Sequence, residues 1–368
     1  MHRAIHRVLN SGLPVVLLLV LIAAAPFLTR PGLPRGTDAE LHVFRAAELG
    51  YSLRAGVLYP RWAPDFYYGY GYPIFNYYAP LTYYLANGFA LLPGLEVVAG
   101  VKAVFVLGFL LAGLGSYLAG RDLSARPSPL AGILAAALYL FSPYILFIDP
   151  HARGDLAEFF ALGLFPLVFW AFWRLLPHRP PSTPPSKPRW GGVVLAALLL
   201  AALILSHNLM ALVGTAVLLV SLAWTWVARR YPPAWGLLVA LLLGLALSAF
   251  FWLPVLLEKD AVHLSLVGPG HFDFRNHFRT LAELLAPSAI LDFGATAPHY
   301  RYNLGLAPWT LALGGLLLFL RNAQARRRIV LAQFPVGAVL LVFLMLPAST
   351  PIWERIPGMA YLQFPWRL

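Results

Sequence analysis

The sequence lacks cysteine and has few charged residues. None of its 368 residues is cysteine, which excludes disulfide bonds, thiolate metal sites and cysteine nucleophiles. Charged residues make up 11% of the chain, whereas ordinary soluble domains contain about 25%. A chain with so little charge cannot cover a water-facing surface, so a cytosolic globular enzyme, a disordered chain and a small secreted protein are excluded.

Apolar residues are abundant instead, at 60% of the chain. A membrane-spanning helix needs about 20 mostly apolar residues, so the sequence predicts an all-α polytopic membrane protein with about nine spans in a single membrane domain, residues 1–368. The first span follows basic residues as a signal peptide would, but we interpret it as a retained anchor. A further apolar stretch, 81–92, is short and predicts an interfacial or re-entrant segment. The predicted spans are 13–29, 96–118, 129–147, 156–176, 192–206, 209–228, 234–254, 303–320 and 330–347.

The charges are distributed unevenly between the two sides of this predicted bundle. With the N-terminus in the cytoplasm, the inner segments contain 14 of the 27 basic residues and one of the 15 acidic residues. This is the positive-inside pattern of a plasma (inner) membrane protein, so the net charge of +12 does not indicate a nucleic-acid partner. Nearly all carboxylates then lie outside. Because the short inner loops carry no P-loop or dinucleotide fingerprint, we expect the chemistry on the extracytoplasmic face.

Two long outer loops, 30–95 and 255–302, are predicted, and a Pro-rich cytoplasmic linker covers 177–190. In the first loop Thr37 and Glu40 have the spacing of a capping box, which predicts a helix that starts at Asp38. On that helix Asp38, His42 and Arg45 share one face. A carboxylate, an imidazole and a guanidinium therefore converge just after the first span.

The rest of the first loop is rich in aromatic residues. Residues 58–84 hold nine of the 17 tyrosines, including Tyr70. An aromatic belt at the headgroup level explains most of these rings. The nearby Gly69, Gly71 and Pro73 indicate a defined fold with interfacial helices, and aromatic faces also suit a sugar or an isoprenoid chain.

The segments TDAELHVFRAAEL and LYPRWAPDFYYGYGYPIFNYYAPLTYYL resemble the bacterial and archaeal membrane family called 6-pyruvoyl-tetrahydropterin synthase-related. Later segments agree, and the resemblance covers most of the chain. The family name implies no pterin chemistry here. In layout the family is similar to GT-C glycosyltransferases, multi-span enzymes that use sugars carried on polyprenyl phosphate and have an acidic residue in the first outer loop. The later segments are HARGDLAEFFALGLFPLVFW at 151–170, HFRTLAELLAPS at 277–288, YNLGLAPW at 302–309 and YLQFPWRL at 361–368.

This resemblance implies a membrane glycosyltransferase that moves a sugar from a polyprenyl-phosphate donor to an extracytoplasmic glycan, lipid or protein. Asp38 takes the place of the catalytic base, with His42 and Glu158 as further catalytic candidates. Mg²⁺ or Mn²⁺ is a candidate cofactor, because hard oxygen ligands suit these ions. The candidate metal ligands are Asp38, Glu40, Asp155 and Glu158. The candidate substrate-binding residues are Arg45, Arg61, Tyr70, Arg153, His277, Arg301 and Arg367.

Two other functions remain open from the sequence. A transporter or flippase for a lipid-linked saccharide would also need many spans, but it predicts polar residues through to the cytoplasmic side. A non-catalytic membrane subunit is the other alternative. The resembling family continues beyond the last motif, so we expect the chain to be truncated at its C-terminus. The sugar, the acceptor and the oligomeric state have no signature in the sequence.

Overall fold

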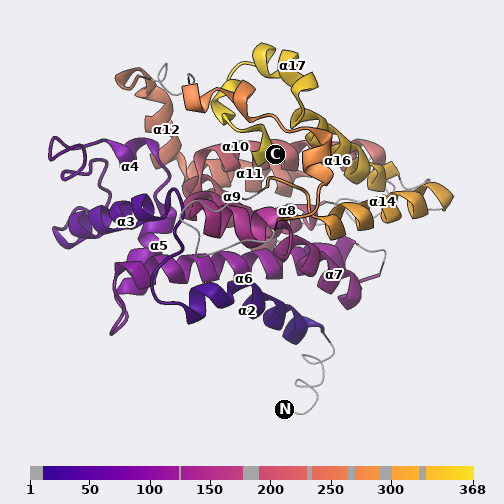
Figure 1. Cartoon of the computed structure of the whole chain (residues 1–368), viewed down its shortest axis with the longest axis horizontal. Helices are drawn as coiled ribbons and strands as arrows, with labels where there is room; N and C mark the ends of the chain where they lie inside the picture. The colour runs from indigo at the N-terminus through magenta and orange to yellow at the C-terminus, as the bar shows by residue number, and fades with distance from the viewer. Residues whose placement is uncertain are drawn as a thin grey trace. The chain divides into compact units, whose positions relative to one another are not determined.

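The computed structural model describes residues 11–123, 126–176, 190–229, 234–263, 270–289, 301–322 and 329–368. Within these ranges the chain is helical, and its one isolated antiparallel bridge joins Ala63 to Tyr72. The linker predicted at 177–190 lies outside the described residues except for Trp190, and so does part of the second long loop. The chain divides into two compact units, each described below by itself (Figure 1).

The first unit comprises Met1–Phe141, Ile145–Gly214 and Tyr231–Val255. Its helices lie close to the predicted spans and are joined by shorter elements of the first long loop. These elements are α2 (Leu13–Thr29), α3 (Ala39–Arg54), α4 (Ile74–Tyr77), α5 (Leu81–Ala90), α6 (Val97–Leu123), α7 (Pro129–Leu140), the π-helix η1 (Tyr144–Arg153), α8 (Leu156–Trp173), α9 (Trp190–Ser206), α10 (Asn208–Arg229), α11 (Trp235–Leu247) and α12 (Ala249–Leu257).

Helix α6 is central to the first unit and packs against α2, α5, α7 and α8. Glycines allow its backbone to approach α8 closely. A Cβ atom at Gly163 would lie 2.5 Å from the carbonyl oxygen of Gly108, and one at Gly115 would lie 2.7 Å from the nitrogen of Leu167. Small residues at such crossings allow close packing inside a membrane, where water does not drive helices together.

The second unit comprises Ser142–Tyr144, Thr215–Arg230 and Leu256–Leu368, so α10 contributes to both units. Its described helices are η2 (Lys259–Ala261), η4 (Gly270–Phe272), η5 (Phe274–His277), α13 (Leu281–Leu285), α14 (Leu306–Arg321), η6 (Ile329–Ala332), α16 (Gln333–Leu344), η7 (Pro347–Ser349), α17 (Thr350–Arg355), η8 (Met359–Leu362) and η9 (Pro365–Arg367). Most of these described helices are short, with α14 and α16 as the longer ones.

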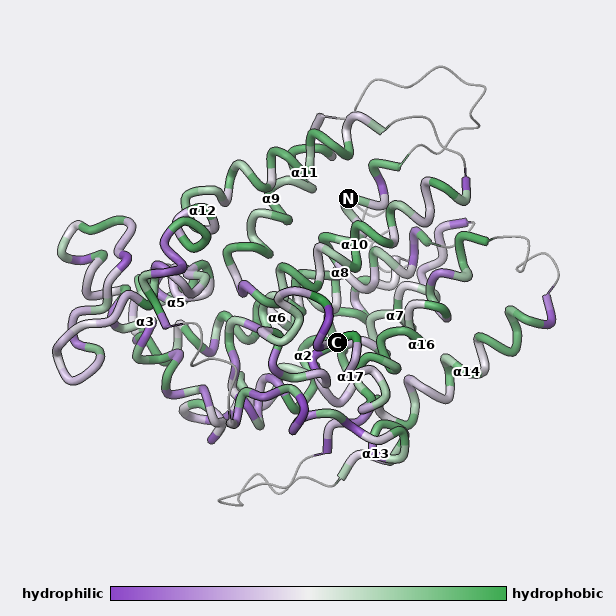
Figure 2. The backbone as a smooth tube through the Cα atoms, turned by 90° about the horizontal axis from the view of Figure 1, so that it is seen from above, coloured by the Kyte–Doolittle hydropathy of each residue, from purple (hydrophilic) through white to green (hydrophobic). Residues whose placement is uncertain are grey.

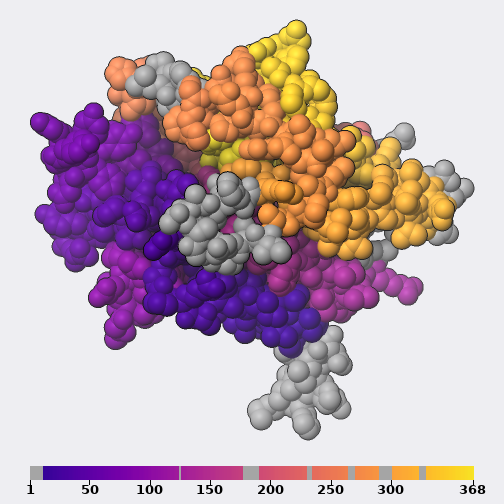
Figure 3. Space-filling view, viewed as in Figure 1, coloured from indigo at the N-terminus to yellow at the C-terminus, as the bar shows by residue number. Residues whose placement is uncertain are grey.

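Four helical stretches of the described chain are long and apolar enough to cross a membrane, or up to six if each of two bent pairs is one span. Three shorter apolar helices, α2, α9 and α14, coincide with other predicted spans. The number nine therefore stays a prediction. Figure 2 shows hydrophobic residues along α9 and α11, and in Figure 3 α2 lies on the visible face of the first unit. Leu18 and Leu21 of α2 have exposed side chains.

Two predicted spans are bent. The span predicted at 234–254 is divided into α11 and α12, which meet at an angle of 68°. The hydroxyl group of Ser248 donates to the carbonyl oxygen of Gly244 at 2.9 Å, and such bonding within a helix favours a bend. The second bend, of 89°, separates Ile329–Leu344 from Pro347–Arg355. Pro347 has no N–H group with which to continue the helix.

Candidate functional site

A buried acidic cluster forms where η1 meets α8. The π-helix η1 ends at Arg153 and is followed by Gly154, whose φ of 71° favours glycine. The N–H groups of Gly154 and Asp155 both donate to the carbonyl oxygen of Asp149, at 2.9 and 3.2 Å. Asp155 then caps α8 by accepting a hydrogen bond from the N–H group of Glu158 at 3.0 Å. The sharp turn brings acidic side chains of both helices to one place.

Arg153 lies at the centre of this cluster and contacts four carboxylates. Its guanidinium is 2.6 Å from Asp149, 2.9 Å from Asp155 and 3.0 Å from Glu158. Asp38 is farther away, at 3.9 Å. The side chains of Arg153 and of the three nearer acids are at most 7% exposed, whereas that of Asp38 is 36% exposed. Asp38 is therefore the carboxylate of this set that solvent reaches most easily.

The start of α3 is attached to the same turn. The N–H group of Asp38 donates to the carbonyl oxygen of Arg153 at 2.7 Å, and the Thr37 hydroxyl donates to that oxygen at 3.3 Å. The predicted capping box is wrong, because the N-cap residue of α3 is Asp38 and the exposed Glu40 lies in the first helical turn. The Thr37 hydroxyl bonds to a residue far along the chain instead.

His42 connects the cluster to a row of polar side chains. Its Nε2 atom is 3.3 Å from the Asp155 carboxylate, and its Nδ1 atom is 2.8 Å from the Tyr83 hydroxyl. Arg45 donates to the same hydroxyl oxygen at 3.3 Å. Burial raises the pKa of Tyr83 to about 12 despite the nearby Arg45, so at neutral pH the phenol keeps its proton and is able to donate it to Nδ1. The proton of a neutral His42 ring then belongs on Nε2, directed at Asp155.

Asp155 is ionised within this arrangement. Burial alone would raise its pKa, but the charge of Arg153 and the hydrogen bond from His42 together hold the pKa well below the usual range. The site therefore contains a fixed, buried negative charge beside a guanidinium.

A second set of side chains near Asp155 has the composition of a metal site. Ligand atoms of Asp155, Glu158 and His207 lie within 4.8 Å of one another, and all three residues are buried. The Nδ1 atom of His207 accepts a hydrogen bond from the N–H group of Met210 at 3.1 Å, so Nε2 is the nitrogen that would bind a cation. Two carboxylates and an imidazole suit Mn²⁺ or Zn²⁺ better than Mg²⁺.

The structure brings together six of the residues proposed from the sequence, namely Asp38, His42, Arg45, Arg153, Asp155 and Glu158, as the contacts above show. Other candidates of the first unit lie elsewhere. Arg61 is exposed and donates to Asn76 at 2.6 Å, Tyr70 is 81% exposed, and Glu40 points outward from α3. Glu40 is therefore a poor partner for the buried metal ligands.

The remaining three candidates belong to the second unit. His277 donates to the carbonyl oxygen of His271 at 2.5 Å, and its ring packs on Phe364. The guanidinium of Arg367 lies 4.6 Å from the centre of the Phe364 ring. Arg301 is exposed at the end of a described segment.

Sequence reasoning did not select Asp149, Tyr83 or His207 for the site. Asp149 lies one turn before Arg153, which is a usable signal because residues four apart contact each other on a helix. Tyr83 is one of many tyrosines in its segment, and a polar turn between two apolar helices explains His207 equally well. Only the tertiary fold distinguishes these two residues from their neighbours.

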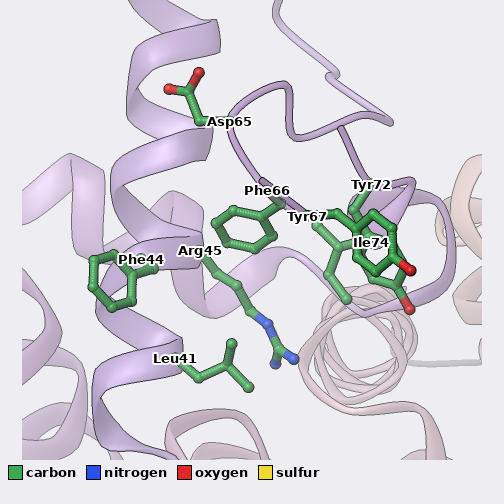
Figure 4. A pocket seen from close by; sticks show the side chains of 8 residues that line it. All are labelled: Leu41, Phe44, Arg45, Asp65, Phe66, Tyr67, Tyr72 and Ile74. Carbon is green, nitrogen blue, oxygen red and sulfur yellow. The ribbon is translucent and has the colours of Figure 1, made fainter. Parts of the chain in front are cut away.

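A pocket of about 480 Å³ opens beside α3 in the first unit (Figure 4). Arg45 reaches into it from the helix, and apolar and aromatic side chains form most of its wall. The residues that line it are Leu41, Phe44, Arg45, Asp65, Phe66, Tyr67, Tyr72 and Ile74.

The chain matches a known membrane protein family in sequence and resembles a solved protein structure in fold. The family model for the 6-pyruvoyl-tetrahydropterin synthase related domain, a membrane protein family, matches residues 75–366. No curated protein matches the chain. The apo crystal structure of ArnT from Cupriavidus metallidurans is similar over 99% of this chain and 59% of its own, with 16% identity and a TM-score of 0.52. ArnT bound to undecaprenyl phosphate matches 97% of this chain and 58% of its own, with 15% identity and a TM-score of 0.48. The chain thus spans about three fifths of the ArnT length.

Proposed function

Because the chain belongs to the 6-pyruvoyl-tetrahydropterin synthase-related family of membrane proteins, and its fold resembles that of ArnT, a GT-C glycosyltransferase, we propose that it is a membrane glycosyltransferase. It moves a sugar from a polyprenyl-phosphate donor to an acceptor on the extracytoplasmic side of the plasma membrane. The observation that supports this best is Asp38, a partly exposed carboxylate at the edge of a buried, charged cluster just after the first apolar helix.

Asp38 is the base in this proposal. It takes the proton of the acceptor hydroxyl while that oxygen attacks the anomeric carbon of the sugar. The bond between that carbon and the phosphate oxygen breaks, and polyprenyl phosphate leaves. This direct displacement inverts the anomeric configuration. The hydrogen bond from Asp38 to Arg153 and the contact between their side chains fix the carboxylate at the edge of the cluster.

The buried residues hold this edge in position. Both ring nitrogens of His42 face protein groups, Asp155 and Tyr83, so we assign His42 a positioning role instead of the catalytic role expected from the sequence. Glu158 and Asp155 orient Arg153. A divalent cation held by Asp155, Glu158 and His207 would add positive charge to this acidic cluster.

Replacing Asp38 by Asn tests this function in the full chain reconstituted into membranes. Transfer of radiolabelled sugar from a panel of polyprenyl-phosphate donors is compared with the parent. We expect the rate to fall about 100-fold or more, because a positioned base contributes roughly that factor, with the melting temperature unchanged. Glu40→Gln is the matched control, since Glu40 is exposed two residues away, and it should retain the parent rate. Undiminished transfer by Asp38→Asn would remove Asp38 from the reaction.

A further inference from the structure

Arg45 is a largely enclosed cation that has no carboxylate within 4.0 Å among the residues the structure describes. Its guanidinium stacks on the Tyr78 ring at 4.2 Å and donates to Tyr83. Its Nε atom is buried and has no hydrogen-bond partner in the described part of the chain. An enclosed charge of this kind is stabilised when an anion binds next to it.

Arg153 has the opposite surroundings. Four carboxylates already lie within 3.9 Å of its guanidinium. A phosphate placed there would meet those negative charges at short distance, which disfavours binding. The sequence suggested both Arg45 and Arg153 as substrate-binding residues, and the geometry favours Arg45 for the phosphate.

The pocket beside Arg45 fits an amphiphilic anion. Its volume of about 480 Å³ falls in the range of roughly 300–1,000 Å³ that is typical of ligand sites. Leu41 and Phe44 of α3 and Phe66 of the facing loop give it an apolar wall. Figure 4 shows the Asp65 carboxylate directed away from the Arg45 guanidinium, so this carboxylate of the pocket wall does not pair with Arg45.

The rim of the pocket has a strained backbone. Tyr67 and Tyr68 adopt positive φ angles of 56° and 61°, which residues with side chains rarely do. The bridge between Ala63 and Tyr72 closes the loop with hydrogen bonds of 2.8 and 2.9 Å and holds this conformation. Backbone strain of this kind concentrates at ligand clamps and active sites.

We propose that this pocket binds the lipid-phosphate part of the donor, with Arg45 on the phosphate and the apolar wall around the first isoprenoid units. The identity of the lipid rests on the proposed function. Arg45 then holds the leaving phosphate, while Tyr83 and His42 connect it by hydrogen bonds to Asp155 in the acidic cluster.

Binding of farnesyl phosphate to the full chain in nanodiscs tests this assignment without any sugar or acceptor. We expect Arg45→Gln to weaken binding about tenfold or more, because a charge-assisted hydrogen bond is lost, while binding of farnesol changes less than twofold. Arg54→Gln is the matched control, because Arg54 is exposed at the far end of the same helix. It should bind farnesyl phosphate as the parent does.

A second measurement covers the case in which Arg45→Gln does not fold. A diazirine analogue of farnesyl phosphate is photocrosslinked to the parent chain, and we expect labelled peptides from α3 or from residues 65–74. Labelling confined to the second unit, or unchanged farnesyl phosphate affinity in a folded Arg45→Gln variant, would overturn the assignment. Binding with this pattern but without sugar transfer would leave the pocket assigned and contradict only the glycosyltransferase function.

Discussion

Asp155 is a buried carboxylate whose oxygens both contact cationic or donating groups. Since its pKa in the folded chain lies below the value of about 3.9 in an unfolded chain, its contribution to stability is present above that value. The contribution is lost as the pH falls through the lower, folded pKa. We therefore expect Asp155→Asn to lower the melting temperature at pH 7, with a smaller difference from the parent below about pH 4.

Melting curves of the two proteins between pH 7 and pH 3 check this prediction. Asp260→Asn serves as control, because Asp260 is exposed and its removal should change little at any pH. A difference between Asp155→Asn and the parent that stays constant over the whole pH range would contradict the role of the Asp155 charge.

The acidic cluster contains more carboxylates than guanidinium groups, so added cations should bind to it. We expect Mn²⁺ at about 100 times its dissociation constant to raise the melting temperature by about 2–4 °C, and EDTA to reverse the effect. His207→Ala should abolish the increase, because it removes the nitrogen ligand of the set. An equal increase in His207→Ala would place the binding site elsewhere.

Part of the site was predictable from the sequence. Asp38, His42 and Arg45 share a face because the helical period dictates it, and Asp155 and Glu158 follow from local spacing. Tyr83 was not predictable. It meets His42 across 41 residues of sequence, and its neighbours in the loop are also tyrosines. Helical periodicity describes one element at a time, whereas this contact depends on how α5 packs against α3.

At the scale of elements, the crossing of α6 and α8 depends on glycine. A Cβ atom at Gly163 would lie 2.5 Å from the Gly108 carbonyl oxygen, and both atoms belong to rigid helices. We expect Gly163→Ala to destabilise the protein by about 1–3 kcal/mol, the usual cost of overpacking, and to lower its melting temperature. Gly314→Ala is the control, because no atom lies within 4 Å of its Cβ position inside α14. A Gly163→Ala variant as stable as Gly314→Ala would show that the crossing tolerates a larger separation.

The positions of helices follow from the sequence better than their shapes do. The apolar run at 13–29 coincides with α2, because hydropathy alone marks its ends. The bend between α11 and α12 has a weaker mark, the polar Ser248 between Leu247 and Ala249, inside a run that hydropathy predicts as one span. At the bend the Ser248 hydroxyl donates to the carbonyl oxygen of Gly244. Composition does not reveal whether a serine hydroxyl bonds to the backbone of its own helix or to solvent.

At the scale of the whole molecule, the charge distribution predicts which side each loop faces. The predicted inner segments carry 14 basic residues and one acidic residue, whereas the predicted outer segments carry both signs in nearly equal number, and such an excess of positive charge on one side is the pattern that orients membrane proteins. The family match and the helical fold agree with a membrane protein, and the side on which each loop lies is a prediction that labelling can test. The acidic cluster should face outward if the pattern holds, because η1 and α8 meet at a predicted outer end.

Helix α6 offers a direct test of this orientation. It spans 27 residues, from Val97 to Leu123, and is therefore about 40 Å long, enough to cross the apolar core of a bilayer. Because the chain has no cysteine, single cysteines report accessibility without background. In intact cells we expect a membrane-impermeant maleimide to label Glu96→Cys, at the outer end, but to label Arg126→Cys only after permeabilisation. The unsubstituted chain is the control and should stay unlabelled. The reverse labelling pattern would invert the topology and place the acidic cluster in the cytoplasm, where a donor presented on the outer face does not reach it. Equal labelling of both cysteines in intact cells would show that α6 does not cross the membrane.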